Sequence, residues 1–207
     1  ALYEKGVGHM GRNETGPAVA AFSDSLREGG RDPALYHALG NALYRQGEEG
    51  HAAAAWQRGL YLSPFDEDIR YNLALEGSSH VPALPVRWGI WLLLSSLAAA
   101  LGSFFTRGIA SRGILVSSLS VSVLSGFLLL HAWHVLSKGV LVEEARARSA
   151  VGGAGASLFT VPQGSIVGVL QEYGGEVQVL YEERKGWVPG SFVVSLDPEA
   201  PFSIPPL

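Results

Sequence analysis

Cysteine is absent from the sequence. This absence excludes disulfide bonds, thiolate metal sites and cysteine nucleophiles, and it is compatible with either a reducing or an oxidising compartment. An excess of basic charge is missing as well, because the formal net charge is −4 at pH 7. A chain without a basic field has no electrostatic means of following a phosphate backbone, so we expect no binding of nucleic acid.

The motifs that mark many enzymes are also missing. The sequence has no glycine-rich phosphate loop, no paired His-Glu metal motif and no Gly-x-Ser-x-Gly elbow. His131 and His134 are spaced to grip a haem or a metal from one helix face, but beside Trp133 they also fit a polar collar. We therefore expect a protein that is not an enzyme and that carries no cofactor.

Formal charge is missing from two long stretches in the middle of the chain, residues 88–106 and 114–137. At about 1.5 Å per residue, a helix of either length crosses roughly 30 Å of hydrocarbon. The pattern predicts two transmembrane helices that form a hairpin over residues 81–139. The expected fold class is therefore a multidomain membrane protein whose hairpin lies in the lipid bilayer.

The connector between these stretches carries Arg107 and Arg112 and no acidic residue. Because Lys and Arg near span ends are retained in the cytoplasm, we expect both ends of the chain on the other side of the membrane. The chain starts at Ala1 rather than Met, as a precursor does after loss of a secretory signal, although a trimmed start looks the same.

A spacing of 34 residues recurs in the N-terminal part of the chain, residues 1–80. The matching pairs are Ala18 with Ala52, Phe22 with Trp56, Leu26 with Leu60, and Leu39 with Leu73. The run LGNALYRQG at 39–47, followed by Pro64, resembles the tetratricopeptide repeat, an all-α helical hairpin. About two and a half repeats are predicted, with Trp56 filling the space beneath Gly40.

This resemblance implies a concave groove that binds protein partners. Its candidate contacts are His37, Asn41, Tyr44, Arg45, Tyr71 and Asn72. Asn41 and Asn72 are similar to the asparagines with which some such domains clamp a C-terminal carboxylate, although His37 stands where a lysine is usual. The alternative is that these polar side chains solvate an exposed helix face.

Short β-rich runs separated by glycine-containing turns occupy residues 140–197. The runs are 158–161, 164–171, 176–181 and 186–189. They predict a small all-β barrel, and with the closing Gly-Trp-Val-Pro they resemble bacterial SH3-like domains. Candidate protein contacts are Trp187, Pro189 and Phe192, although Trp187 also fits a core or wall position. A Pro-rich tail follows at residues 198–207.

The order of these segments resembles the BatE proteins of the Bacteroides aerotolerance (Bat) operons. The resemblance implies a multi-pass protein of the bacterial inner membrane with both soluble domains in the periplasm. It implies a membrane-anchored, non-catalytic scaffold in envelope or oxidative stress tolerance. The implied partners are von Willebrand factor A-domain membrane proteins and a BatD-like protein, linked to a MoxR-type ATPase.

Two other functions fit the sequence. The barrel could belong to a cell-wall-binding module that recognises peptidoglycan. The pair His131 and His134 could instead make the protein a haem or metal carrier.

Overall fold

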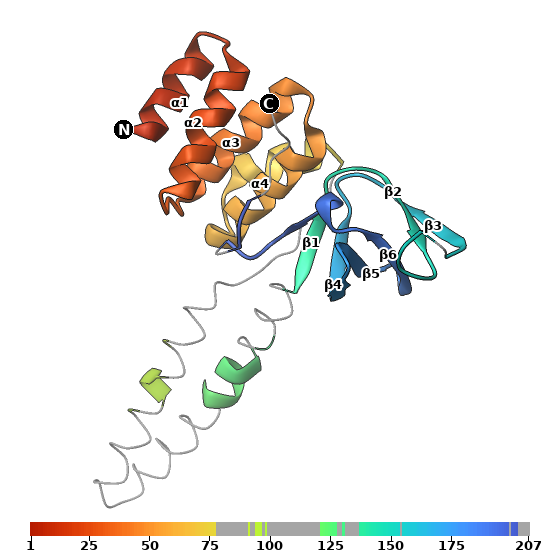
Figure 1. Cartoon of the computed structure of the whole chain (residues 1–207). Coiled ribbons are helices and arrows are strands. Elements are labelled where there is room, and N and C mark those ends of the chain that lie inside the picture. Colours follow the sequence, from red (N-terminus) through yellow and green to blue (C-terminus); the bar gives the residue numbers. More distant parts are fainter. Residues whose placement is uncertain are drawn as a thin grey trace, which may run out of the picture. The chain divides into compact units, whose positions relative to one another are not determined.

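The computed structural model describes residues 1–77, 137–153, 155–198 and 200–202, and also 91, 94–96, 98, 121–127 and 130. The chain divides into two compact units, Ala1–Pro82 with Leu136–Leu207, and Ala83–Val135. Most of the described residues belong to the first unit, and Figure 1 labels most of its helices and strands.

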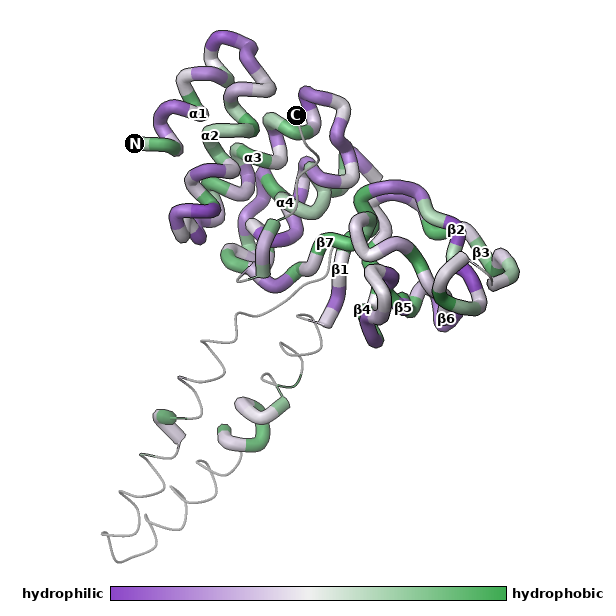
Figure 2. The backbone as a smooth tube through the Cα atoms, viewed as in Figure 1, coloured by the Kyte–Doolittle hydropathy of each residue, from purple (hydrophilic) through white to green (hydrophobic). Residues whose placement is uncertain are grey.

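The first half of this unit is helical. Its helices are α1 (Leu2–Gly11), α2 (Thr15–Arg27), α3 (Pro33–Gln46), α4 (Glu49–Leu62) and α5 (Glu67–Leu75). Local chemistry sets several boundaries: the carboxylate of Asp32 accepts from the Ala34 N–H, and Asp66 accepts from the Ile69 N–H. Gly47 ends α3 with a left-handed φ of 88°, which glycine adopts without steric cost. In Figure 2 the helices alternate between hydrophobic and hydrophilic stretches, as amphipathic helices do.

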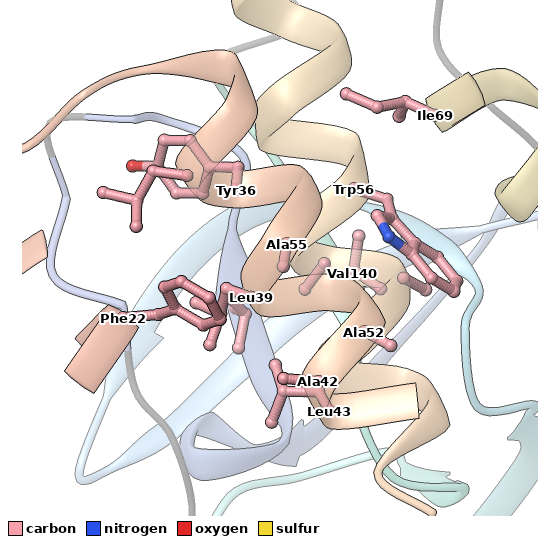
Figure 3. Close-up of a cluster of buried hydrophobic side chains, with 14 of the residues drawn as sticks. Phe22, Tyr36, Leu39, Ala42, Leu43, Ala52, Ala55, Trp56, Ile69 and Val140 are labelled. Carbon is pink, nitrogen blue, oxygen red and sulfur yellow. The ribbon is translucent and has the colours of Figure 1, made fainter. Parts of the chain in front are cut away.

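Glycines allow the helices to approach closely. A Cβ atom added at Gly40 would collide with the Trp56 ring, and one added at Gly6 would collide with Phe22. The prediction that Trp56 fills the space beneath Gly40 is thus confirmed. Figure 3 shows Trp56 beside α3, in a cluster of buried hydrophobic side chains.

The second half of the unit is an antiparallel sheet of seven strands in the order β3-β2-β6-β5-β4-β1-β7. The strands are β1 (Lys138–Leu141), β2 (Ala145–Arg148), β3 (Ser157–Val161), β4 (Ile166–Tyr173), β5 (Glu176–Tyr181), β6 (Arg184–Pro189) and β7 (Val193–Ser195), with a 3₁₀ turn at Gly190–Phe192. Val177 and Val179 of β5 pack with Ala145 and Ala147 of β2, so the sheet buries alternate side chains in its own cluster.

The sheet and the helices also share one hydrophobic core. Val140 and Val142 are buried in the same cluster as Leu39 and Ala52–Ala55, and Figure 3 shows Val140 beside Ala52 and Ala55. The prediction of a multidomain protein, with a tetratricopeptide-repeat domain and a separate SH3-like barrel, is therefore wrong. The described fold is a mixed helical and antiparallel-sheet fold, because α4 buries one side against helices and another against strands.

Arg58 of α4 fastens the end of the sheet to the helices. Its side chain is 1% exposed, and it donates from Nε to the Ser195 carbonyl at 2.9 Å and from Nη1 to the Ala200 carbonyl at 2.8 Å. Nη2 donates to the Pro201 carbonyl at 3.3 Å. Its guanidinium also lies 4.9 Å from the centre of the Phe202 ring. The described beginning of the Pro-rich tail is therefore held against α4.

The N-terminal end of α4 also contacts the sheet half of the unit, at Val142. A Cβ atom at Gly50 would collide with the backbone of Val142, so only glycine fits without a shift. The neighbouring His51 is 5% exposed. Burial lowers the pKa of His51, and the carboxylates of Glu48 and Glu143 oppose this effect. We call the contacts of Gly50 with Val142 and of Arg58 with Ser195, Ala200 and Pro201, together with the buried His51 beside Gly50, the helix–sheet seam.

The described residues contain no helix that is long and apolar enough to cross a membrane. The predicted spans at 88–106 and 114–137 lie largely outside the described residues, as does the connector with Arg107 and Arg112; the longest described stretch is 121–127. The prediction of a multi-pass inner-membrane protein with periplasmic domains is therefore not supported. The described residues form the mixed helical and antiparallel-sheet fold instead. A charge-free run establishes composition rather than a continuous apolar helix, and in the described parts the hydroxyls of Ser96 and Ser122 bond to each other at 2.8 Å.

Candidate functional site

A hollow of about 240 Å³ opens between four helices, and we call it the groove hollow. It is lined by Met10 of α1, Asn41, Tyr44 and Arg45 of α3, Trp56 of α4, and Asn72 and Leu75 of α5. The rings of Tyr44 and Trp56 form one wall, with their centres 5.6 Å apart. Tyr44 is 40% exposed, so this wall is accessible from outside.

A hydrogen-bond network beneath the hollow fixes the orientation of its amides. The indole Nε1 of Trp56 can only donate, so the Asn41 atom 3.1 Å from it is the carbonyl oxygen Oδ1. The same oxygen accepts from Nδ2 of Asn72 at 3.0 Å. Nδ2 of Asn72 also lies 3.0 Å from Nε2 of His37, which therefore acts as the acceptor. With both bonds of Oδ1 assigned, the Nδ2 group of Asn41 is held as a donor on the other side of its amide.

The structure brings most of the predicted groove residues together. Asn41, Tyr44, Arg45 and Asn72 line the hollow, because positions 41, 44 and 45 share one face of α3. His37 accepts a hydrogen bond from the Asn72 amide and does not line the hollow. Tyr71 is 67% exposed on α5, outside the hollow.

Three lining residues were not among the predicted contacts, namely Met10, Trp56 and Leu75. The sequence predicts Trp56 as a core residue. In the structure Trp56 is buried in the core and also lines the hollow. The spacing of Asn72 and Leu75, three residues apart on α5, was a usable signal for Leu75. Met10 lies in a helix without a clear repeat pattern, so no sequence signal pointed to it.

The groups around this hollow favour binding rather than bond-breaking. An aromatic wall, two amides and the guanidinium of Arg45 are present, and among the described lining residues Arg45 alone carries a formal charge. Aromatic side chains and arginine are the groups that most often contribute binding energy at protein interfaces.

The predicted contacts Trp187, Pro189 and Phe192 line a second hollow, of about 160 Å³, at the edge of the sheet. Arg146, Arg148, Glu144 and Glu176 line it too, so both signs of charge surround the aromatic groups. Trp187 is partly buried and pairs with Arg148 across the strands. Oε2 of Glu176 accepts from the N–H of Gly152 at 3.0 Å, which ties the glycine-rich turn to this hollow.

The third candidate pair, His131 and His134, lies outside the described residues. Over the part of the chain that the structure describes, no three His, Asp or Glu side chains are grouped so as to hold a metal ion. Comparison of the chain with protein-family models, with curated proteins and with solved structures gives no match.

Proposed function

We propose that the protein is a non-catalytic adaptor that binds a segment of a partner protein in the groove hollow. The observation that carries the proposal is the prearranged wall of this hollow. Trp56 and Asn72 hold the Asn41 amide in one orientation, and the Tyr44 ring lies beside the Trp56 ring in a tilted arrangement. A ligand therefore meets donors and an aromatic surface that need little ordering on binding.

The size and chemistry of the hollow support an extended peptide segment as the ligand. About 240 Å³ accommodates one or two side chains rather than a folded surface. Apolar groups from Met10, Leu75 and the two rings suit an apolar or aromatic side chain of the partner. Arg45 at the rim suits a neighbouring carboxylate.

The test is a double substitution, Tyr44→Ala with Arg45→Ala, in the full-length chain. Both side chains are exposed and neither belongs to the Asn41 network, and alanine has the best helix propensity, so α3 should persist. Losing a Tyr and an Arg contact should remove about 2–4 kcal/mol and weaken partner affinity roughly 30- to 1000-fold. The measurement is quantitative mass spectrometry of proteins that co-purify with the tagged chain.

The matched control is Tyr71→Ala with Arg70→Ala, which removes the same residue types from α5 outside the hollow. Both side chains are exposed there. We expect wild-type recovery of partners from this control and loss from the Tyr44 and Arg45 variant. Wild-type recovery from both variants would exclude the groove hollow as the docking surface. The implied von Willebrand factor A-domain proteins and BatD-like protein are the first partners to measure.

Peptidoglycan binding remains a second candidate, and the observation that favours it is the sheet-edge hollow. An indole near charges of both signs, as at Trp187 with Arg148 and Glu176, suits a ligand that carries both sugar and charged peptide. Sedimentation of the full-length chain with purified sacculi tests it, with Trp187→Ala as the variant. Sedimentation that is lost with this variant favours the cell-wall function, whereas no sedimentation excludes it.

A further inference from the structure

Another described hollow has a different character from the groove hollow. It measures about 300 Å³ and lies between α2, α3, α4 and the segment that follows β7. Arg27, Arg31 and Arg58 line it, and none of the described lining residues is acidic. We call it the arginine hollow.

The bonds that these arginines make leave positive charge in the hollow. Nη1 of Arg31 donates to the carbonyls of Leu26 and Gly30, both at 2.8 Å, and these acceptors are neutral. Arg58 likewise donates to backbone carbonyls. Arg27 pairs with Asp24, but this pair is exposed and therefore weakly held.

Two further observations indicate that Arg31 and Arg58 would be stabilised by an acceptor of negative charge. Nε of Arg31 is buried and has no hydrogen-bond partner, an arrangement that costs free energy and that in folded proteins often marks a bound water or ion. Burial lowers the pKa of Arg58, and the charge of Arg31 adds to this, whereas Tyr36 and Asp197 oppose it. The guanidinium groups of Arg31 and Arg58 thus repel each other across this region, and an anion between them would relieve the repulsion.

We propose that the arginine hollow binds an oxyanion, the carboxylate or phosphate group of a small ligand, with Arg27 and Arg31 as its ligating residues. The planar guanidinium fork matches both groups, because each presents two oxygens at the spacing of two N–H donors. The hollow has the volume of about ten water molecules, so the anion and part of the molecule that carries it fit inside. This site is separate from the groove hollow and does not depend on the proposed function.

The test is NMR of the full-length chain, following the arginine Nε–Hε signals during titration with inorganic phosphate and, separately, with acetate. Chloride keeps the ionic strength constant in both titrations, because screening alone changes surface electrostatics. We expect the Arg31 signal to shift and to saturate with at least one anion. Tighter binding of phosphate assigns the site to phosphate groups, and tighter binding of acetate assigns it to carboxylates.

Three variants test the assigned residues. Arg27→Gln removes an exposed charge without disturbing the fold and should weaken binding about 2- to 5-fold. Arg31→Lys keeps the charge but removes Nε, and it should weaken binding about 10-fold or more. Arg70→Gln, on the exposed face of α5, is the control and should leave the affinity unchanged. Equal affinity in the wild type and in Arg27→Gln, or no saturable shift with either anion, would overturn the proposal.

A final titration tests whether the carboxylate of Glu199 in the same chain fills the site. Glu199 precedes Ala200 in the sequence, and Ala200 lines the hollow. The titrations are therefore repeated with Glu199→Gln. Saturable binding in the wild type supports an external ligand, whereas binding that occurs only in Glu199→Gln overturns the proposal.

Discussion

The groove hollow and the helix–sheet seam lie on two sides of the same helix, α4, and they treat polar groups differently. In the groove, Trp56 and Asn41 bond to each other and leave an open space beside exposed Tyr44. In the seam, Arg58 is fully buried and bonds to backbone carbonyls. Every residue of α4 from Gly50 to Tyr61 is buried, so the helix is enclosed on both sides.

The comparison separates residues that shape a surface from residues that join two halves of a fold. Groove side chains are held by other side chains, so one substitution there changes recognition and leaves the backbone paths in place. Seam side chains hold backbone, so a substitution there loosens a whole segment. The largest expected effect comes from the residue that belongs to the groove and also to the core.

Trp56→Ala should lower the free energy of unfolding by about 3–5 kcal/mol, because it leaves a cavity between α3 and α4. Trp56→Phe fills most of that space but lacks the Nε1–H donated to Asn41, so it should cost about 1 kcal/mol for the hydrogen bond, plus any loss of packing. Urea denaturation followed by circular dichroism measures both. Equal losses in the two variants would contradict the cavity explanation.

Arg58→Met should lower the free energy of unfolding by about 2–4 kcal/mol, because the carbonyls of Ser195, Ala200 and Pro201 lose their donor. Amide hydrogen exchange should accelerate in residues 195–202 and stay near wild type in α1 and α2. Arg70→Met, at an exposed position of α5, should stay within about 0.5 kcal/mol of wild type. Unchanged exchange in residues 195–202 would show that Arg58 does not hold this segment.

Gly50→Ala should cost about 1–3 kcal/mol, because the new methyl group collides with the backbone of Val142. Gly16→Ala is the matched control, since a Cβ atom there has no neighbour within 4 Å. Alanine at that helical position should leave stability unchanged or raise it by up to about 1 kcal/mol. Thermal unfolding of both variants measures the difference, and similar melting temperatures would contradict a tight seam at Gly50.

The smallest effect should come from pH. Burial lowers the pKa of His51, so folding favours its neutral form, and Glu48 and Glu143 reduce this preference. The stabilising contribution is complete above the unfolded-state pKa, about 6.5, and declines as the pH falls through that value toward the lower folded-state pKa. When the pH is lowered from about 7 to about 5, the free energy of unfolding of the wild type should therefore fall more steeply than that of His51→Gln. Parallel curves for the two proteins would refute the prediction.

The sequence supplied the local parts of this fold. The β-rich runs between glycine-containing turns predicted strands over 158–161 and 176–181, and the structure has β3 and β5 there. Gly40 could be paired with Trp56 because a small and a large residue stand at sequence positions that two antiparallel helices of a hairpin bring together. These features depend on neighbours within about 20 residues, which a linear pattern records.

The seam could not be predicted, because its partners are far apart in the sequence. The run Ala52–Ala55 reads as ordinary helix–helix packing, and nothing in it indicates that β1 covers it. Arg58 resembles any surface arginine until the carbonyls of residues 195–201 are placed around it. The membrane interpretation counted uncharged residues, and the described residues contain no helix that is long and apolar enough to cross a membrane.

The hydrogen bond from the Tyr36 hydroxyl to the Pro198 carbonyl, 3.2 Å long, joins residues that are 162 positions apart. The first unit is therefore completed only after residue 198 has been synthesised, long after α3 has formed. Closing so long a loop costs more entropy than a local contact does, and it slows the final step of folding. Until β1 has been synthesised and has packed on α4, Ala52–Ala55 have no strand to cover them, so the nascent chain passes through a stage in which this surface is open to mispairing.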